Sequence, residues 1–300
     1  MNVVFAINKS YITQLGTCLT SILENNQKEF FKFYILHSEL TEQNYLQIYS
    51  LKRKYNNFNI ILIKIDKESV KNLKINIDYI SKETYYRYFI ANLLDEDKCL
   101  YLDADTIVKG NIVELYNTDI SNYCCAGCRD LYIETIDYKK QVGLDNDLYI
   151  NAGVILFNLK KFRQENYVQK LLDNNLMLQD KIQFQDQDVI NITFKNNIKE
   201  VSSIYNFCSS NMHDESNSLL QAIILHYTGA IKPWDKNYKG KCKEDWYKYH
   251  KLYLDILKTD IEKRDKEIIQ LKKELNIILK KQCFSNIIHK LTSFKKHKEV

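Results

Sequence analysis

The chain has 300 residues, of which 45% are hydrophobic, and a formal net charge of +5. This length suits one large α/β domain with a smaller terminal segment, and the hydrophobic share is enough for a sizeable core. So small a charge does not indicate a nucleic-acid-binding protein, and no apolar run in the sequence is long enough to cross a bilayer.

The predicted elements alternate between short apolar strands and amphipathic helices. The expected strands are residues 3–7, 31–36, 60–65, 99–102, 124–128, 154–157 and 222–225. Apolar residues at helical spacing predict helices around 15–23 and over 41–55, 83–94, 160–175 and 186–194. Alternation of this kind is typical of βαβ units with a parallel sheet. The uniformly apolar strands agree, because a parallel sheet is covered by helices on both faces.

The composition changes near residue 246, so we expect a main body at 1–245 and a helical region at 246–300. Residues 246–257 predict a helix that packs on the body. Residues 261–279 predict either a partner-binding helix or a solvated amphipathic one. The apolar stripe over 284–294 is surrounded by lysines, which is typical of a helix on an anionic membrane surface. Docking on the body or on another subunit is the alternative, so an oligomer stays open.

The first residues lack the charged and apolar segments of a signal peptide. We therefore expect the cytoplasm, where cysteines stay reduced. Together with the basic C-terminal stripe, this predicts a cytoplasmic protein that is peripheral on the inner face of the membrane.

Two acidic side chains follow an apolar strand. Asp103 and Asp105 come directly after the run at 99–102. Side chains two residues apart on an extended segment project to the same side, and open α/β sheets bind ligands at the carboxyl ends of their strands. Neighbouring carboxylates repel each other unless a cation lies between them, and Mn²⁺ and Mg²⁺ prefer oxygen ligands. A metal site is one interpretation, and an acidic surface turn is the other.

A second polar cluster follows the strand expected at 222–225. His226 ends that run, and Gly229, Lys232 and the only proline of the chain, Pro233, come shortly after it. Imidazole can serve as a third metal ligand, Lys232 can neutralise diphosphate oxygens, and Gly229 would let the backbone approach them. A histidine with a purely structural role is the alternative.

Four motifs follow one another along the chain: Leu100-Tyr101-Leu102-Asp103-Ala104-Asp105, Asn151-Ala152-Gly153-Val154, Gln185-Asp186-Gln187-Asp188 and His226-x-x-Gly229-x-x-Lys232-Pro233-Trp234. In this order they resemble glycosyltransferase family eight, and in particular its bacterial lipopolysaccharide galactosyl- and glucosyltransferases. The resemblance covers about residues 1–240. It implies the A-type glycosyltransferase (nucleotide-diphospho-sugar transferase) fold, with a mostly parallel central sheet flanked by helices, and a retaining enzyme.

The resemblance also implies roles for single residues. Mn²⁺, or alternatively Mg²⁺, would be held by Asp103, Asp105 and His226. The sugar nucleotide would be bound by Ala6, Asn8, Tyr11, Arg87, Ala104, Asn151, Ala152, Asp186, Gln187, Gly229 and Lys232, as well as by the metal ligands. Asp130 would lie near the acceptor. The family usually has an acid at the position of Asn8, whose amide can still hydrogen-bond to the uracil edge.

The reaction implied is transfer of galactose or glucose from UDP-galactose or UDP-glucose to a saccharide acceptor on a surface glycolipid such as lipopolysaccharide. The metal and Lys232 would stabilise the charge on the departing UDP. Gln187 matches the residue on the β-face of the sugar. Because an amide is a weak nucleophile, front-face attack is favoured over double displacement, while Asp188 and Asp130 remain candidate carboxylates. Two alternatives stay open: a self-glucosylating, glycogenin-like enzyme with a tyrosine acceptor, and a non-catalytic protein that binds nucleotide sugars or glycans.

Overall fold

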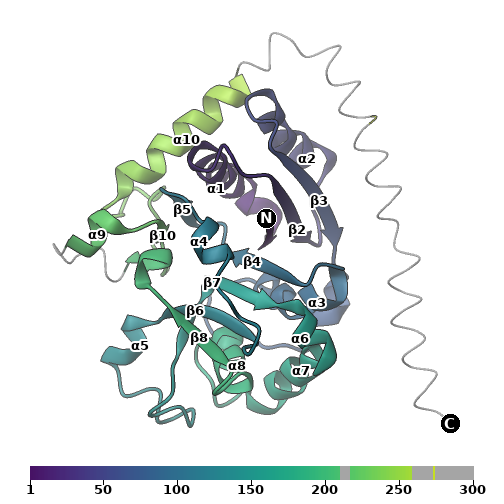
Figure 1. Ribbon diagram of the computed structural model, residues 1–300, viewed down its shortest axis with the longest axis vertical. Helices are drawn as coiled ribbons and strands as arrows, with labels where there is room; N and C mark the ends of the chain where they lie inside the picture. Colours follow the sequence, from purple (N-terminus) through teal and green to yellow (C-terminus); the bar gives the residue numbers. More distant parts are fainter. Residues whose placement is uncertain (210–216, 259–272, 274–300) are drawn as a thin grey trace.

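The computed structural model describes residues 1–209, 217–258 and 273, and its centre is a large β-sheet with helices on both faces (Figure 1). The sheet is formed by β1 Asn2–Ala6, β2 Phe31–His37, β3 Phe58–Lys64, β4 Lys98–Leu102, β6 Cys125–Arg129, β7 Ile150–Asn158 and β8 Ile198–Val201, in the order β3-β2-β1-β4-β7-β6-β8. All of these strands except β7 run in one direction. The predicted α/β class and mostly parallel sheet are confirmed.

A small second sheet lies beside the first. It consists of β5 Thr106–Val108, β10 Ile224–His226 and β9 Phe207–Cys208, in the order β5-β10-β9. The chain leaves the large sheet at the end of β4 and enters the small sheet at β5 within a few residues. This short connection joins the two sheets at the point where Asp103 and Asp105 stand.

The helices divide between the two faces of the large sheet. The α-helices are α1 Ile12–Asn25, α2 Glu42–Tyr49, α3 Ile90–Leu93, α4 Val113–Tyr116, α5 Leu131–Thr135, α6 Leu159–Gln164, α7 Tyr167–Leu178, α8 Gln185–Thr193, α9 Asn217–Gln221 and α10 Lys243–Lys258, and the 3₁₀ helices are η1 Lys9–Tyr11, η2 Ser50–Arg53, η3 Lys67–Val70, η4 Lys82–Phe89 and η5 Ser203–Tyr205. Because side chains alternate along a strand, Val3 and Phe5 pack in the cluster that includes α1 and α2, whereas Val4 packs with η4, α7 and α8.

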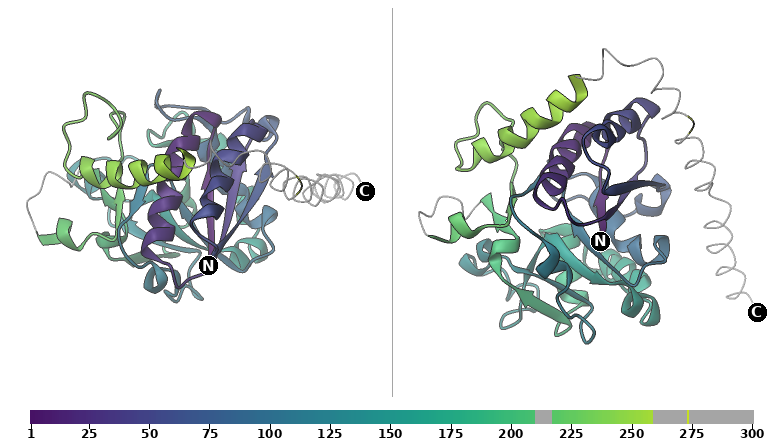
Figure 2. Two further views of the ribbon diagram at one scale, coloured as in Figure 1. Left: turned by 90° about the horizontal axis from the view of Figure 1, so that it is seen from above. Right: turned by 45° about the horizontal axis from the view of Figure 1, so that its top comes forward.

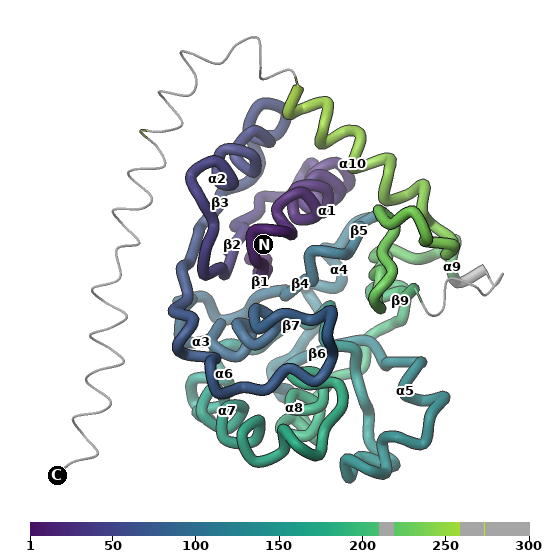
Figure 3. The backbone as a smooth tube through the Cα atoms, turned by 180° about the vertical axis from the view of Figure 1, so that it is seen from behind, coloured from purple at the N-terminus to yellow at the C-terminus, as the bar shows by residue number. Residues whose placement is uncertain are grey.

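Helix α10 runs along α1, on the same face as α2 (Figures 2 and 3). Its side chains Trp246, Tyr249, Tyr253 and Ile256 are buried. The helix predicted at 246–257 therefore forms and packs on the body, although it begins at Lys243. The patterns at 261–279 and 284–294 lie outside the described residues, so the division at residue 245 stays a proposal. None of the helices within residues 1–209 and 217–258 is long and apolar enough to span a membrane.

Three predicted helices differ in detail from the observed ones. The segment 41–55 forms α2 and then tightens into η2, as last turns often do. The segment 83–94 is mainly the 3₁₀ helix η4, with α3 as its last turn. The segment 160–175 is divided between α6 and α7 because Asn166 adopts a left-handed φ of 53°, which asparagine tolerates better than most residues.

Candidate active site

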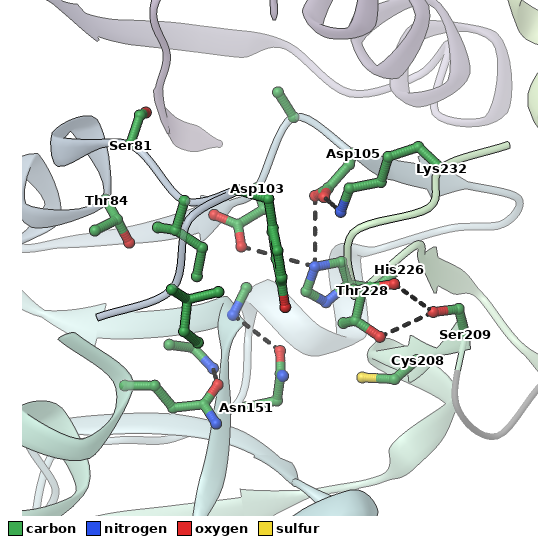
Figure 4. Close-up of a pocket in the computed structure, with 18 of the residues that line it drawn as sticks. Ser81, Thr84, Asp103, Asp105, Asn151, Cys208, Ser209, His226, Thr228 and Lys232 are labelled. Carbon is green, nitrogen blue, oxygen red and sulfur yellow. Dashed lines mark hydrogen bonds and ion pairs between the residues drawn. The ribbon is translucent and has the colours of Figure 1, made fainter. Parts of the chain in front are cut away.

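A cavity of about 920 Å³ opens where strands of both sheets end (Figure 4). The large sheet contributes the ends of β1 and β4 and the start of the antiparallel β7, and the small sheet contributes the ends of β9 and β10. Every residue that the sequence predicts for sugar-nucleotide or metal binding lines this cavity, and Asp130 does so as well. Asp188 is the exception and is described below.

The two predicted metal-binding acids are held by a turn between the sheets. The backbone N–H and the hydroxyl of Thr106 both donate to the carbonyl of Asp103, at 3.2 and 2.8 Å. In the antiparallel pair of β5 and β10, Thr106 stands directly opposite His226. This register brings a histidine that is distant in sequence next to Asp103 and Asp105.

The two acids and the histidine form a compact cluster. Nε2 of His226 lies 3.4 Å from Oδ1 of Asp105 and 3.7 Å from Oδ2 of Asp103. One ligand atom from each of the three residues lies within 4.8 Å of the others, and Figure 4 shows the imidazole facing both carboxylates. Two carboxylates and an imidazole are donors that divalent metal ions accept, so the residues present fit such an ion.

The hydrogen bond on the other side of the imidazole fixes the tautomer of His226. Nδ1 lies 3.0 Å from Oδ1 of Asn206, and the amide nitrogen of Asn206 donates to Asn151 at 3.0 Å. The amide oxygen can only accept, so Nδ1 carries a hydrogen. In the form of the ring that binds a metal ion, Nε2 is therefore the nitrogen with the free electron pair. Histidine ligands of metals are usually oriented in this way.

Gly153 leaves room for the cluster. A Cβ atom at this position would lie 2.1 Å from Cε1 of His226 and 2.8 Å from Oδ2 of Asp103. The glycine of the Asn151-Ala152-Gly153 motif is therefore required by the approach of these two side chains to β7.

Lys232 forms a buried ion pair with the cluster. Its Nζ lies 2.6 Å from Oδ2 of Asp105 and donates to the carbonyl of Tyr227 at 2.6 Å. Burial alone would raise the pKa of Asp105, but Lys232 and His226 outweigh it and hold that pKa well below its usual range. Gly229, in the same loop, has a φ of 84° and open space where a Cβ would stand. This loop therefore brings a cation and an unobstructed backbone to the cavity.

Arg87 ties Asp103 to Asp186. The buried guanidinium pairs with Oδ1 of Asp103 at 3.1 Å and with Oδ2 of Asp186 at 3.0 Å, donates to the carbonyl of Ala152, and lies 4.3 Å from the centre of the Tyr101 ring. Burial raises the pKa of Asp186, and the charge of Arg87 opposes that rise. Arg87 thus lines the cavity, as predicted, while its charge is shared between two carboxylates.

A network of amides lines the wall near Asp130. Gln187 donates from Nε2 to Oδ2 of Asp130 at 3.1 Å and accepts from the backbone N–H of Ala152 at 3.0 Å. Asn151 donates to the same oxygen of Asp130, also at 3.0 Å. The nitrogen and the oxygen of the Gln187 amide therefore each have a hydrogen-bond partner, which fixes the orientation of the amide. Asp130 lies beside it at the cavity wall.

Asp188 does not line the cavity. Its side chain is fully buried and accepts from the hydroxyls of Tyr138 and Tyr149 and from the backbone N–H groups of Gln183 and Phe184. Asp188 therefore binds the backbone N–H groups just before α8, behind the cavity wall. The prediction that Asp188 acts at the reacting centre has no support in this arrangement.

The loop after β1 forms the opposite wall. Asn8 caps η1 by accepting from the backbone N–H of Ser10 at 3.0 Å, and its Nδ2 donates to the hydroxyl of Ser81 at 3.3 Å. Ala6 and Tyr11 line the cavity on either side of Asn8, and the segment containing Ser81 lines it too. The Asn8 amide therefore links two segments of the cavity wall.

Several residues at the site were not predicted. Tyr101 donates to Asp103 at 2.8 Å, and its place two residues before Asp103 on β4 was the available signal. Asn206 is hydrogen-bonded to His226, and Thr84 donates a hydrogen bond to Asp186. The sequence around Asn206 and Thr84 contains no motif that indicated these contacts. Further lining residues had no sequence signal; they include Tyr132 of α5, Cys208 at the end of β9, and Phe184, Ser209, Thr228 and Tyr238 outside the helices and strands named above.

Comparison with known proteins places this site in a family. The sequence profile of glycosyl transferase family 8 matches residues 2–238. A putative glycosyltransferase of Haemophilus influenzae is 32% identical over 244 residues, which cover 79% of this chain and 73% of that protein. The lipopolysaccharide 1,2-glucosyltransferase of Escherichia coli is 29% identical, with 93% of this chain and 85% of that protein covered.

Further relatives show how far the likeness extends. Glycosyltransferase GlyA of Streptococcus pneumoniae is 30% identical over 83% of this chain, which spans only 34% of that longer protein. The structure of the galactosyltransferase LgtC with donor and acceptor sugar analogues superposes with a TM-score of 0.75 at 28% identity, covering 83% of this chain and 95% of LgtC. The protein described here belongs to glycosyl transferase family 8 and is a glycosyltransferase similar to a lipopolysaccharide glucosyltransferase and to the galactosyltransferase LgtC.

Proposed function

We propose that this protein is a retaining, metal-dependent hexosyltransferase that moves galactose or glucose from a UDP-sugar to a saccharide acceptor of a surface glycolipid such as lipopolysaccharide. The observation that carries the proposal is the cluster of Asp103, Asp105 and His226 beside Lys232 in one cavity. Three metal-ligating side chains and a lysine together suit a diphosphate with its cation. Mn²⁺ is the ion proposed, with Mg²⁺ as the alternative.

The residues would act mainly on the charge of the leaving group. Asp103, Asp105 and His226 would hold a divalent cation, which would supply positive charge next to the diphosphate of the leaving group. Lys232 pairs with Asp105 in the free protein. The Nζ of Lys232 has three hydrogens and uses two of them on Asp105 and the carbonyl of Tyr227. Its third hydrogen suits a diphosphate oxygen, where Lys232 would stabilise the developing charge.

We favour front-face attack as the route to retention. Gln187 is a neutral amide whose oxygen already accepts from Ala152, so it suits stabilisation of the positive sugar carbon rather than covalent attack. Asp188 accepts four hydrogen bonds behind the cavity wall and would need to break them to act as a nucleophile. Asp130, which does line the cavity, is the remaining carboxylate beside Gln187.

The sugar and the acceptor are proposed from the relatives. A lipopolysaccharide glucosyltransferase and a galactosyltransferase are both similar to this chain over most of its length. The apolar stripe at 284–294 with its surrounding lysines lies outside the described residues. We propose that it holds the enzyme at the anionic inner face of the membrane, where the enzyme would meet a lipid-linked acceptor.

A panel of donors tests the proposal. Purified protein with Mn²⁺ is incubated with UDP-, GDP- and CMP-sugars, and the released nucleotide is measured with and without EDTA. The expected result is release from one UDP-hexose that EDTA abolishes. A mass increase of the protein itself in UDP-glucose would instead show self-glucosylation, and failure to release nucleotide with any donor or acceptor would indicate a binding protein.

A further inference from the structure

Helix α10 is fixed to the body at several points along its length. Near its start, Asp245 pairs with Lys109 at 3.3 Å. Further along, the hydroxyl of Tyr249 accepts from Nδ2 of Asn25 at 2.8 Å. The ring of Tyr253 lies so close to α1 that a Cβ on Gly16 would come within 2.2 Å of it. These contacts leave α10 little freedom to move relative to α1.

A row of aromatic rings leads from α10 to the cavity. His250 stacks on Trp246 with ring centres 4.3 Å apart and an angle of 22°. Trp246 contacts Trp234 at 5.2 Å, and Trp234 meets the ring of Tyr11 edge-on at 6.1 Å. We call these four rings the aromatic row. Its members come from α10, from the loop after β10 and from η1.

The outer end of the row is anchored on α1. The hydroxyl of Thr17 donates its one hydrogen to the carbonyl of Thr13 at 2.9 Å, so it accepts from Nδ1 of His250 at 3.2 Å. Trp246, the next ring, is only 3% exposed. The position of these two rings is therefore set by α1 and α10, independently of any ligand.

The inner end of the aromatic row lies at the cavity, because Tyr11 is one of the residues that line it. Trp234 lies in a turn in which the backbone N–H of Lys232 donates to Asp235 at 3.1 Å and the N–H of Asp235 donates to the carbonyl of Lys232 at 2.8 Å. A shift of Trp234 would therefore move both the ring of Tyr11 and the backbone that carries Lys232.

We propose that Trp246 is a positioning residue for the sugar-nucleotide site: it holds Trp234, and through it Tyr11 and Lys232, in the geometry that binds the nucleoside diphosphate. This inference rests on the proposed function and extends it to a helix that does not itself line the cavity. Contacts between aromatic rings stabilise the geometry in which the rings meet, beyond the effect of their buried area. Loss of the Trp246–Trp234 contact is thus expected to weaken nucleotide binding roughly three- to tenfold.

Three variants on α10 separate positioning from stability. Trp246→Leu removes the ring, Trp246→Phe keeps an aromatic contact, and Tyr249→Phe removes only the hydrogen bond with Asn25 and leaves the row intact. The dissociation constant of UDP with Mn²⁺ is measured by calorimetry, alongside the melting temperature and the KM and kcat for donor hydrolysis.

We expect Trp246→Leu to raise the dissociation constant and the donor KM about three- to tenfold, with a smaller fall in kcat because Lys232 also acts on the leaving group. Trp246→Phe should restore part of the affinity, and Tyr249→Phe should bind UDP like the wild type even where its melting temperature falls. Wild-type affinity in Trp246→Leu, or equal weakening in Tyr249→Phe, would overturn the inference.

Tryptophan fluorescence tests the inference on the wild-type protein, so the result does not depend on whether a variant folds. The chain has two tryptophans, and both belong to the aromatic row. Binding of UDP beside Tyr11 is therefore expected to change the tryptophan emission of the wild type. Unchanged emission while calorimetry shows UDP bound would contradict the inference alone. Failure of the wild type to bind UDP would contradict the proposed function and the inference with it.

Discussion

Oδ1 of Asn206 lies 3.0 Å from Nδ1 of His226 and so determines which nitrogen of the imidazole faces Asp103 and Asp105. The amide of Asn206 is itself oriented by its donation to Asn151. Without this acceptor the ring can turn, or place its hydrogen on Nε2, where it would face the metal site. The relationship therefore predicts that Asn206 controls metal affinity without contacting the metal.

Replacing Asn206 with leucine is expected to weaken Mn²⁺ binding about 10- to 100-fold, as loss of such supporting contacts typically does. Asn206→Asp keeps an acceptor for Nδ1 and should retain most of the affinity. Titration of free Mn²⁺ by electron paramagnetic resonance measures both. Equal affinity in the leucine variant and the wild type would show that the contact does not orient the ligand.

Gly153→Ala is expected to abolish metal binding, because the added methyl group would meet both His226 and Asp103. Gly110→Ala is the matched control, since a Cβ there meets Ile223 at an ordinary 3.6 Å. The same Mn²⁺ titration distinguishes the two, with circular dichroism to show that both variants fold. Normal metal affinity in a folded Gly153→Ala protein would contradict the described cluster.

Gln187 and Asp188 are adjacent in sequence, and their substitutions should have opposite consequences. Gln187→Ala removes a group at the cavity wall, so we expect kcat to fall with little change in stability. Asp188→Asn places an amide group against four donors, so we expect a loss of about 2–3 kcal/mol in the free energy of unfolding. Urea unfolding and steady-state kinetics of both variants test this, and a stable but inactive Asp188→Asn protein would return Asp188 to the reacting centre.

A buried histidine that does not line the cavity predicts how stability depends on pH. Nδ1 of His37 accepts from the backbone N–H of Leu40, and burial, helped by Lys64, lowers the pKa of His37 to about 4. Between pH 6.5 and 4 the unfolded chain binds a proton that the folded protein does not. This contribution to stability is present above pH 6.5 and is lost as the pH falls to about 4.

The free energy of unfolding is expected to fall by about 3 kcal/mol over this range, because each pH unit between the unfolded and the folded pKa of His37 contributes about 1.36 kcal/mol. Urea unfolding at a series of pH values, with His37→Gln as the comparison, measures it. The variant should show a shallower fall in stability below pH 6.5. Parallel curves for variant and wild type would show that His37 does not titrate as described.

Much of the fold and the site could be predicted from local patterns. The apolar strands indicated the parallel sheet, and the place of Asp103 and Asp105 directly after β4 indicated a site at the end of that strand. The two acids converge through the turn between β4 and β5, however, and not through a continued strand with a period of two. His226 could be joined to them only through the resemblance to a family, because the contact depends on the register between β5 and β10. Pairing in a small sheet whose strands have two or three residues leaves almost no periodic signal.

Other features could not be predicted from the sequence for a different reason. Asp188 stands next to Gln187 in the same motif, yet the first turn of α8 directs one side chain to the cavity and the other into the core. The aromatic row joins residues from η1, the loop after β10 and α10, and no local pattern links them. Contacts between distant segments of the chain decided each of these cases.

The most direct test of the account is UDP release from a UDP-hexose, measured for the wild type and for Asp103→Asn, with EDTA treatment followed by Mn²⁺ addition. We predict that EDTA stops the wild-type reaction, that Mn²⁺ restores it, and that Asp103→Asn stays inactive at every Mn²⁺ concentration. Turnover that continues in EDTA, or a fully active Asp103→Asn enzyme, would contradict a metal-dependent transferase centred on Asp103, Asp105 and His226.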